Sequence, residues 1–375
     1  MKQCEVYLDH NATTPVDPRV TEAVLPYLGG LFGNPSSGHA CGERPRAALR
    51  QAREQVAALI AARPGEVVFT GSGSEANLLA IRGAALAGRR HVVTQATEHP
   101  AVLETCRALQ RLHGVRVTVL PVGPGGRLDP SALAAVAGLD AALVSVMAAN
   151  NETGVLQPIR ELADVARRHG ALFHCDAAQA AGKIPLDVGE LGVDLLTVVG
   201  HKMYAPKGIA ALYVRDGVRL EPVVYGGGQE RGLRAGTENV ALAAGLGAAA
   251  VLAAEDLAGG VPARIAALRD ELLRRLEAGL PGRVHRNGSA EHCLPNTLNV
   301  SINGVLGADV LAAAPGVAAS TGSACHSGTH TPSPVLTAMG LPAARALGAL
   351  RLSLGRWSTP DDIASAADAL IAAAG

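Results

Sequence analysis

The chain has 375 residues, with 33 basic and 33 acidic side chains and a formal net charge of zero. Its core must be built mainly from Ala, Val and Leu, because only one Trp, five Tyr and three Phe are present. This length allows two or three domains and excludes disordered and fibrous classes of protein. No Lys/Arg cluster adjoins an aromatic platform, which argues against a nucleic-acid-binding protein.

The longest segment without charged or strongly polar side chains, Val240–Ala254, is shorter than the roughly 18–20 residues that cross a bilayer. We predict a buried helix there and no membrane association. The N-terminal residues MKQCEVYLDHN show no apolar leader, so we expect a cytoplasmic protein. The six cysteines form no CxxC pair, which predicts reduced thiols and no resident metal.

Short β-branched runs alternate with helix-length segments between about residues 45 and 215. This alternation predicts an α/β fold with a mostly parallel seven-stranded sheet and helices on both faces. Two intervening helices carry end signals, one over Glu75–Leu86 after a Gly/Ser loop and one between Pro158 and Gly170. The predicted strands are Val67–Thr70, His91–Thr94, Val115–Leu120, Ala142–Met147, Ala171–Cys175, Leu195–Val199 and Ile209–Val214.

The pattern changes in the last third of the chain. A glycine loop at Gly226–Gly228 and an Ala-rich helix from Asn239 are followed by a predicted helix, Pro262–Gly279. A strand at Thr297–Ile302 and a helical tail come next. We predict a large domain over residues 15–257 and a smaller α+β domain over residues 258–375, completed by residues 1–14.

A run of small residues, TGSGSEAN at Thr70–Asn77, lies between a predicted strand and a helix. Free N–H groups at such a helix start, with serine hydroxyls, favour an anion such as a phosphate. The run has neither the GxGxxG nor the GxxxxGK[ST] spacing, which argues against nicotinamide and nucleotide-triphosphate sites. An ordinary strand-to-helix turn is the alternative interpretation.

Polar residues also follow two neighbouring strands. Asp176 and Gln179 come at the end of one strand, and His201 and Lys202 at the end of the next. The carboxyl ends of parallel strands share one edge of the sheet, so these residues are predicted to meet there. Lys202 alone would be interpreted as a solvated side chain. An acid, a lysine and an anion loop together match pyridoxal phosphate (PLP), which needs a Schiff-base lysine, a carboxylate and a phosphate site.

Seven motifs resemble those of the NifS/IscS-type cysteine desulfurases, in the class V aminotransferase group. They occur in order over nearly the whole chain. The resemblance implies a PLP-dependent transferase of fold type I, a homodimer, and conversion of L-cysteine to L-alanine with an enzyme-bound persulfide. The motifs are Tyr7–Pro15, Gly33–Ser37, Thr97–His99, Asn150–Gly154, Gly200–Lys202, Gly226–Arg231 and Gly322–Cys325.

The resemblance also implies roles for individual residues at the cofactor. Lys202 would be the Schiff-base lysine, Asp176 the partner of the pyridine nitrogen, and Gln179 a donor to the ring hydroxyl. His99 would stack on the ring and relay protons, and Asn151 would lie near the ring hydroxyl. As alternatives, a histidine at a strand end or an Asn-Asn pair in a turn needs no ligand.

The phosphate would be held by Gly73, Ser74 and His201, with Thr237 of the partner subunit. One position departs from the family pattern, because Val199 stands where the family usually has a serine that bonds the phosphate. We therefore predict weaker cofactor retention, with more reliance on Ser72, Ser74 and Thr237.

For the substrate carboxylate, the resemblance implies Arg351 as a bidentate clamp, assisted by Asn34. Gly33–Pro35 would also serve as a plain turn.

Cys325 lies in a run of small polar residues, Ser320–Gly328, outside any predicted strand, so we expect it exposed on a mobile loop. The resemblance makes it the persulfide carrier and a transient iron–sulfur ligand that passes sulfur to an acceptor protein such as an iron–sulfur scaffold. His326 beside it either lowers the thiol pKa or has no role. The other cysteines are interpreted as small buried hydrophobes; they are Cys4, Cys41, Cys106, Cys175 and Cys293.

Several alternatives stay open from the sequence. The runs Ala324–Ser327 and Pro332–Leu336 are also similar to selenocysteine lyases of the same family, which share the cofactor residues. A simple aminotransferase would have no use for an exposed Cys325. A non-catalytic binding protein on a Rossmann-like sheet would not need the Asp, Gln, His, Lys and Cys together.

Overall fold

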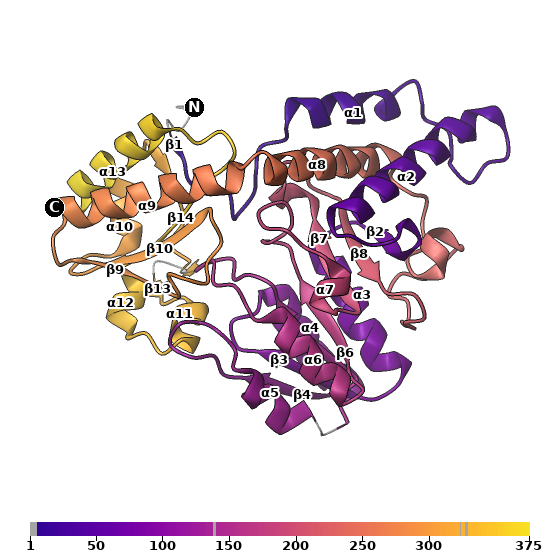
Figure 1. Ribbon diagram of the computed structural model, residues 1–375, viewed down its shortest axis with the longest axis horizontal. Helices are drawn as coiled ribbons and strands as arrows, with labels where there is room; N and C mark the ends of the chain where they lie inside the picture. The colour runs from indigo at the N-terminus through magenta and orange to yellow at the C-terminus, as the bar shows by residue number, and fades with distance from the viewer. Residues whose placement is uncertain (1–5, 138–139, 323, 327–328) are drawn as a thin grey trace.

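The computed structural model describes residues 6–137, 140–322, 324–326 and 329–375, with residues 137, 324–326 and 329–330 described by their backbone alone. A large sheet with helices on both faces fills one part of the molecule, and a smaller sheet lies beside it (Figure 1). Cys4 lies outside the described residues.

The large sheet has seven strands in the order β2-β8-β7-β6-β5-β3-β4. Strand β8 runs antiparallel to both of its neighbours, whereas all the other pairs are parallel. The predicted strands are confirmed, each within one residue. They are β2 (Val67–Thr70), β3 (His91–Gln95), β4 (Arg116–Leu120), β5 (Leu143–Met147), β6 (Leu172–Asp176), β7 (Leu195–Val199) and β8 (Ala210–Val214).

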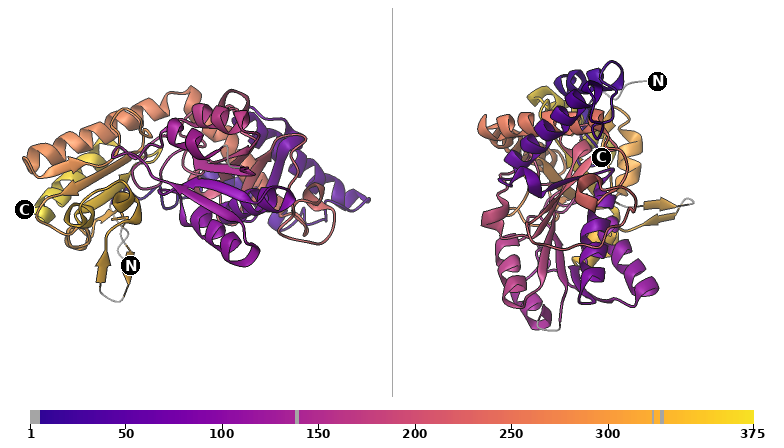
Figure 2. Two further views of the ribbon diagram at one scale, coloured as in Figure 1. Left: turned by 90° about the horizontal axis from the view of Figure 1, so that it is seen from below. Right: turned by 90° about the vertical axis from the view of Figure 1, so that its right-hand side faces the viewer.

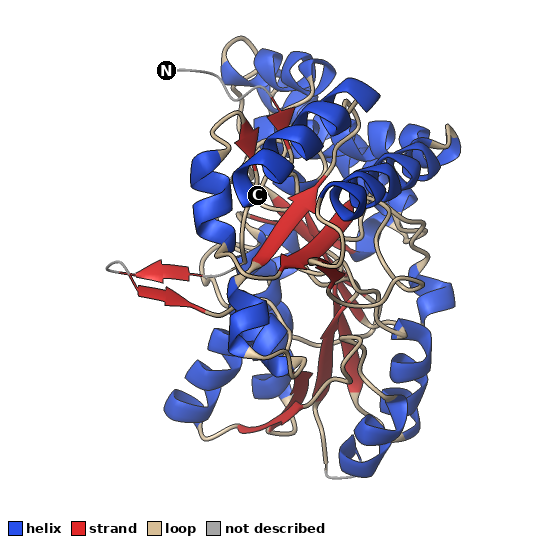
Figure 3. Ribbon diagram, turned by 90° about the vertical axis from the view of Figure 1, so that its left-hand side faces the viewer, coloured by secondary structure: helices blue, strands red, loops and turns tan. Residues whose placement is uncertain are grey.

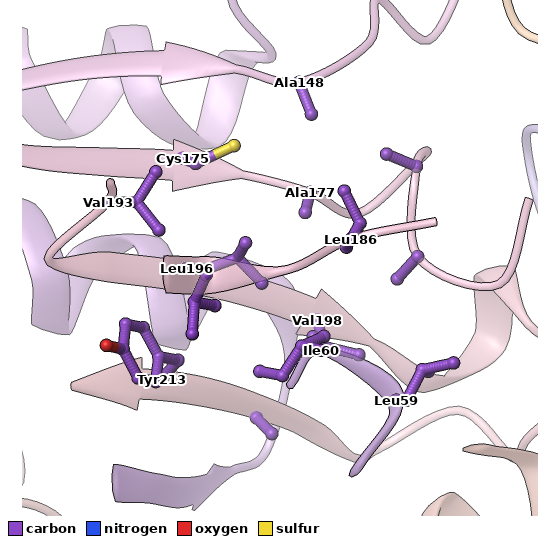
Figure 4. Packing of buried hydrophobic residues seen from close by; sticks show 14 of the residues in the cluster. Leu59, Ile60, Ala148, Cys175, Ala177, Leu186, Val193, Leu196, Val198 and Tyr213 are labelled. Carbon is purple, nitrogen blue, oxygen red and sulfur yellow. The ribbon is translucent and has the colours of Figure 1, made fainter. Parts of the chain in front are cut away.

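Apart from the partly exposed edge strand β4, the sheet is buried on both faces, which is why strands such as β5, β7 and β8 are mostly apolar. Helices α3 (Gly73–Ala87) and α4 (Pro100–His113) cover one face. Helices α2 (Ala40–Leu59), α6 (Ile159–Arg168) and α8 (Val240–Ala258) cover the other. Figure 4 shows Cys175, Leu196 and Tyr213 on neighbouring strands within this core. Cys106 and Cys175 are buried, as predicted. The same prediction is wrong for Cys41, which is exposed near the start of α2, and Cys293 is only partly buried.

Helix α8 is the one helix among the described residues that is long and apolar enough to cross a membrane by length and composition alone. It packs against α1 (Pro18–Leu28) and α2 (Figure 1). A Cβ on Gly247 would lie 2.7 Å from the Cα of Ala52, so the glycine permits close helix packing. Such packing is typical of a core helix, which agrees with the burial predicted for this segment.

The smaller body contains the antiparallel sheet β14-β10-β9, formed by Ala349–Ser353, Thr297–Ile302 and Val284–Arg286. Helices α9 (Val261–Gly279) and α13 (Pro360–Ala374) pack on each other, and their apolar faces share one core with this sheet and with Val6 and Leu8. This shared core supports the proposed division into residues 15–257 and a small domain completed by the N-terminus. Strand β14 was not predicted, because the sequence analysis expected only a helical tail after β10.

The segment around Cys325 differs from its prediction. Ala324–His326 forms strand β12 and pairs antiparallel with β13 (Thr329–Thr331), with Cys325 opposite His330. This hairpin projects from the body of the molecule (Figures 2 and 3). The prediction of a segment outside any strand is therefore wrong. The β-branched threonines after a Ser-Gly dipeptide were a hairpin signal, but strands of three residues are too short to show alternation.

The remaining elements connect these layers. Short strands β1 (Val6–Tyr7) and β11 (Val317–Ala318) pair in parallel. The other helices and helical turns are η1 (Pro64–Glu66), α5 (Pro130–Ala137), α7 (Val188–Leu191), η2 (Gly200–Lys202), η3 (Gln229–Gly232), α10 (Gly307–Ala313), α11 (Pro334–Ala338) and α12 (Ala343–Leu347).

Candidate active site

A cavity of about 360 Å³ opens at the carboxyl ends of β5, β6 and β7. Because the carboxyl ends of parallel strands leave a crevice, this is where an open α/β sheet binds ligands. The structure brings eight of the predicted residues to its wall: Gly73, Ser74, His99, Asn151, Asp176, Gln179, His201 and Lys202.

One end of the cavity is formed by the start of helix α3. The Ser72 hydroxyl accepts a hydrogen bond from Glu75 N at 3.1 Å and caps the helix, and Gly73 and Ser74 follow in its first turn. The N–H groups of a first helical turn lack partners within the helix, so they favour an anion. A Cβ on Gly73 would lie 2.5 Å from Cγ2 of Val199, so a glycine is needed beside that valine.

A buried carboxylate also lines the cavity. Asp176 ends strand β6, and its two oxygens accept hydrogen bonds from Asn77 Nδ2 at 2.7 Å and from Ala178 N at 2.9 Å. These two donors hold the carboxylate in one orientation toward the cavity. Asn77 was missed as a functional residue, although an asparagine inside an apolar helix is a signal, since asparagine disfavours helix interiors.

His99 lies where β3 leads into helix α4. Its Nδ1 accepts a hydrogen bond from Ala101 N at 3.1 Å, which places the proton of the neutral ring on Nε2. Burial lowers the pKa of His99, and Lys202 lowers it further, although Asp176 acts in the opposite direction. The imidazole is therefore neutral at pH 7 and can take up or release a proton through Nε2 or its face.

Lys202 ends the short helical turn η2 that follows β7. Its Nζ donates to the carbonyl oxygens of Asn11 at 2.6 Å and Ala12 at 2.8 Å. Burial, followed by the charge of Arg351, lowers the pKa of Lys202 to about 8. A lysine whose amine loses its proton this readily is suited to nucleophilic attack on a carbonyl.

Asn11 joins several of these side chains, and the sequence analysis did not give it a role. Its carbonyl oxygen accepts from both Lys202 Nζ and Gln179 Nε2, the latter at 2.9 Å. Its side-chain oxygen accepts from Lys183 Nζ at 3.2 Å, and Lys183 also donates to Gln179 Oε1 at 2.8 Å. The N-terminal segment thus fixes the orientation of Gln179 and the resting position of Lys202.

Three predicted residues, Asn34, Thr237 and Arg351, do not line this cavity within the single chain. Asn34 is exposed in the loop after α1, where its Oδ1 accepts from Ser36 N at 2.9 Å. Thr237 is exposed and lines a neighbouring cavity, which shares Gly208 and Ile209 with the first. The side chain of Cys325 lies outside the described parts of the structure.

Arg351 lies beside the cavity on strand β14. Its guanidinium pairs with Asp9 at 2.6 Å and donates to the backbone oxygen of Asn151 at 3.5 Å. Its buried Nε has no hydrogen-bond partner in the part of the chain that the structure describes. Asp9 was missed, because no local pattern reveals an acid that neutralises an arginine more than 300 residues away. The unpartnered Nε is a donor that a substrate carboxylate could use.

The donor set fits pyridoxal phosphate. The start of α3 with Gly73 and Ser74 suits the phosphate, the fixed Asp176 carboxylate suits a protonated ring nitrogen, and Lys202 suits the aldehyde carbon. The buried Asn151 Oδ1 has no hydrogen-bond partner within the described residues, so it is free for a ligand group. The sequence and the fold therefore agree on one class of cofactor.

Comparison with known proteins gives the same result. Residues 6–365 match the family described as aminotransferase class-V. A cysteine desulfurase of Trichormus azollae is 48% identical over 362 residues, covering 96% of this chain and 90% of the relative. A mitochondrial cysteine desulfurase of Drosophila melanogaster is 45% identical over 372 residues, covering 98% and 80%. A solved structure of a NifS-like protein has a TM-score of 0.91 at 34% identity and covers 98% of both chains.

The family match spans nearly the whole chain and includes every residue that lines the cavity. The seven-stranded mixed sheet and the smaller body belong to the same fold as the NifS-like structure. The chain therefore belongs to the class V aminotransferase family and is a pyridoxal-phosphate-dependent enzyme.

Proposed function

We propose that this enzyme is a cysteine desulfurase, which converts L-cysteine to L-alanine and moves the sulfur to Cys325 as a persulfide. The observation that carries this proposal is the cavity in which Asp176, His99 and Lys202 meet, in a chain closely related to cysteine desulfurases. Cys325 must also reach an acceptor protein in this proposal. The hairpin that carries it projects from the body of the molecule, which suits that requirement.

Each residue has a distinct task in this proposal. The bound cofactor supplies an electron-withdrawing ring that stabilises negative charge on the substrate carbon. Asp176 keeps a proton on the ring nitrogen, and Lys202 and His99 move protons at the substrate side of the cavity. Arg351 binds the substrate carboxylate through its unpartnered Nε, and Gln179 orients the ring hydroxyl.

A homodimer completes the site in this proposal. Leu25, Leu28 and Phe32, on α1 and the loop that follows it, are 57%, 66% and 80% exposed. Exposed apolar side chains that gather in one place are typical of a protein–protein contact. Asn34 lies two residues beyond Phe32, so burial of this surface against a second copy would bring Asn34 toward the partner's cavity. The exposed Thr237 would reach the partner's phosphate site in the same way.

We also propose a cytoplasmic location and transfer of the sulfur to an acceptor protein in iron–sulfur cluster or thio-cofactor biosynthesis. The thiols of Cys41, Cys106, Cys175 and Cys293 form no disulfide, which suits a reducing compartment.

The test is parallel kinetics with L-cysteine and L-selenocysteine, together with mass spectrometry of the Cys325 peptide. We expect alanine release from cysteine and a sulfur adduct on Cys325, with the adduct absent in Cys325→Ala. If selenocysteine alone is consumed, the enzyme is a lyase for that substrate and the proposal is wrong. A parent protein that binds no cofactor would contradict both activities.

Val199 gives a prediction about cofactor affinity. Its side chain lies against Gly73 in the phosphate end of the cavity, where a hydroxyl would meet the phosphate. Val199→Ser should bind PLP about 5- to 10-fold more tightly, since one added hydrogen bond contributes about 1 kcal/mol. Val199→Thr, whose side chain is closer in shape to valine, should do the same. The measurement is the dissociation constant of PLP by absorbance titration.

Val199→Ala is the control for this effect, because it removes methyl groups without adding a hydroxyl. It should bind PLP no more tightly than the parent does. Unchanged or weaker binding in both hydroxyl variants would show that the phosphate site is already saturated by other donors.

A further inference from the structure

A buried glutamate outside the cofactor cavity joins the cavity to the hairpin that carries Cys325. Glu152 is only 8% exposed, and it follows Asn151, which lines the cavity. The side-chain oxygen of Asn150 accepts hydrogen bonds from Glu152 N at 2.9 Å and Thr153 N at 2.9 Å. Asn150 Nδ2 donates to the carbonyl oxygen of Thr97 at 2.9 Å, so the turn is held against the segment before His99.

The Glu152 carboxylate lies between the two ends of the hairpin. After the hairpin, the Ser333 hydroxyl donates to Glu152 Oε2 at 2.5 Å and also caps helix α11 by accepting from Leu336 N. Before the hairpin, Gly322 has a φ of +72° and lies so close to Oε2 that a side chain would collide with the carboxylate. One carboxylate therefore contacts both segments that lead to Cys325.

The segment that precedes the hairpin is also attached to the substrate side of the site. Ser320 and Arg351 exchange backbone hydrogen bonds, of 2.6 Å from Arg351 N and 3.3 Å from Ser320 N. Asn299 of strand β10 donates to the backbone oxygen of Glu152 at 3.1 Å. The segment before the hairpin thus lies beside Arg351, and the segments on both sides of the hairpin meet Glu152.

We propose that Glu152 is a positioning residue for Cys325, because its carboxylate bonds Ser333 after the β12–β13 hairpin and packs against Gly322 before it, next to the turn that forms a wall of the cavity. An isolated two-stranded hairpin is only marginally stable. Among the described residues, β12 and β13 pair with each other and with no further strand. Contacts at its base therefore decide where it points. This inference rests on the proposed function of Cys325, but not on the identity of the sulfur acceptor.

The chemistry of Glu152 fits a role in holding rather than in reacting. Burial raises its pKa to about 7, although the Ser333 hydrogen bond and Arg351 both act to lower it. Burying a carboxyl group costs free energy, so the group needs a hydrogen bond, which an apolar residue in its place could not make. Ser333 provides that contact, since its hydroxyl bonds the carboxylate and the start of α11 at once.

The experiment separates two steps in single-turnover mixing with L-cysteine. The change in the cofactor's absorbance reports substrate reaction in the cavity, and mass spectrometry reports the sulfur adduct on Cys325. In Glu152→Ala the absorbance change should stay within about 3-fold of the parent. The adduct should form about 10- to 100-fold more slowly, as expected when a reacting group is displaced by about 1 Å.

Conservative and paired variants show whether the hydrogen bond is the cause. Glu152→Gln keeps an acceptor for the Ser333 hydroxyl and should restore most of the adduct rate. Ser333→Ala should slow adduct formation as Glu152→Ala does, and the double variant should be little slower than either single one, because both remove one interaction. Glu66→Gln is the control. Glu66 is a buried glutamate that accepts hydrogen bonds from Arg63 far from the hairpin, so this variant should leave both steps unchanged.

Hydrogen exchange supplies a measurement that does not depend on activity. Backbone amides of β12 and β13 should exchange faster in Glu152→Ala than in the parent, with little change elsewhere. The inference is overturned if exchange and adduct rate match the parent in both Glu152→Ala and Ser333→Ala, or if the two reaction steps slow equally. If the parent itself forms no adduct, the proposed function fails, and exchange alone then decides whether Glu152 holds the hairpin.

Discussion

Replacing Lys202 with alanine is expected to lower kcat/KM with L-cysteine by about 10⁴-fold or more, because the variant loses both a nucleophile and a proton-transfer group. In the parent, borohydride reduction should leave the cofactor attached to the peptide containing Lys202. In Lys202→Ala that mass shift should be absent, while the fold remains intact. Lys207→Ala is the matched control, since Lys207 is exposed at the same cavity and should leave the attachment at Lys202 in place.

The same lysine gives the site a pH dependence in its cofactor-free form. Burial and Arg351 lower the pKa of Lys202 from 10.5 to about 8, so the amine is protonated below pH 8 and neutral above it. Because only the neutral amine can attack a carbonyl, PLP uptake should slow about tenfold per pH unit below 8 and level off above 8. Stopped-flow absorbance from pH 6 to 10 measures this rate. A rate still rising at pH 10 would mean that Lys202 keeps an ordinary pKa.

Asp176→Asn is expected to lower kcat about 10³-fold without unfolding the protein. The amide has nearly the same shape, and its oxygen can still accept from Ala178 N. Its Nδ2 can donate to Asn77 Oδ1, which has no partner among the described residues, once the Asn77 amide turns over, so thermal stability should change little. What it loses is the negative charge that keeps a proton on the ring nitrogen. Steady-state kinetics measures the loss of kcat, and a thermal unfolding curve of the same variant shows whether the fold is intact.

Asn77→Ala is the companion to this variant. It removes the 2.7 Å hydrogen bond that orients Asp176 but leaves the charge in place, so the loss in kcat should be nearer tenfold. If Asp176→Asn retained kcat within tenfold of the parent, the ring nitrogen would not depend on a charged partner and this assignment of Asp176 would be wrong.

The strands were predictable because each is a short run rich in β-branched and other apolar residues, separated from the next by a segment of turn residues or of helix length. Asp176 and Lys202 end or follow two such strands, and the rule that parallel strands share a carboxyl edge was enough to place both beside one cavity. The start of α3 was visible for a similar reason, since glycine and serine before a helix form a local pattern. These features depend on neighbours along the chain.

The hairpin of Cys325 and strand β14 were missed for a different reason. Strands of three residues show too little alternation to be distinguished from a loop, and β14 has the apolar composition of the helices around it. Pairing with β10 makes Ala349–Ser353 a strand and thereby sets Arg351 beside Asn151 and Asp9. Tertiary contacts, rather than local propensity, decided these two elements.

The sequence by itself determined the class of fold, the cofactor and the residues that meet at the edge of the sheet, because periodicity and motif spacing are local properties of the chain. Only the tertiary structure decided what holds those residues in place. Asn11 accepts from Lys202 across 191 positions, and Glu152 accepts from Ser333 across 181. Such partners are chosen by how two distant surfaces pack, since a buried polar group must find a hydrogen bond wherever the fold brings a donor.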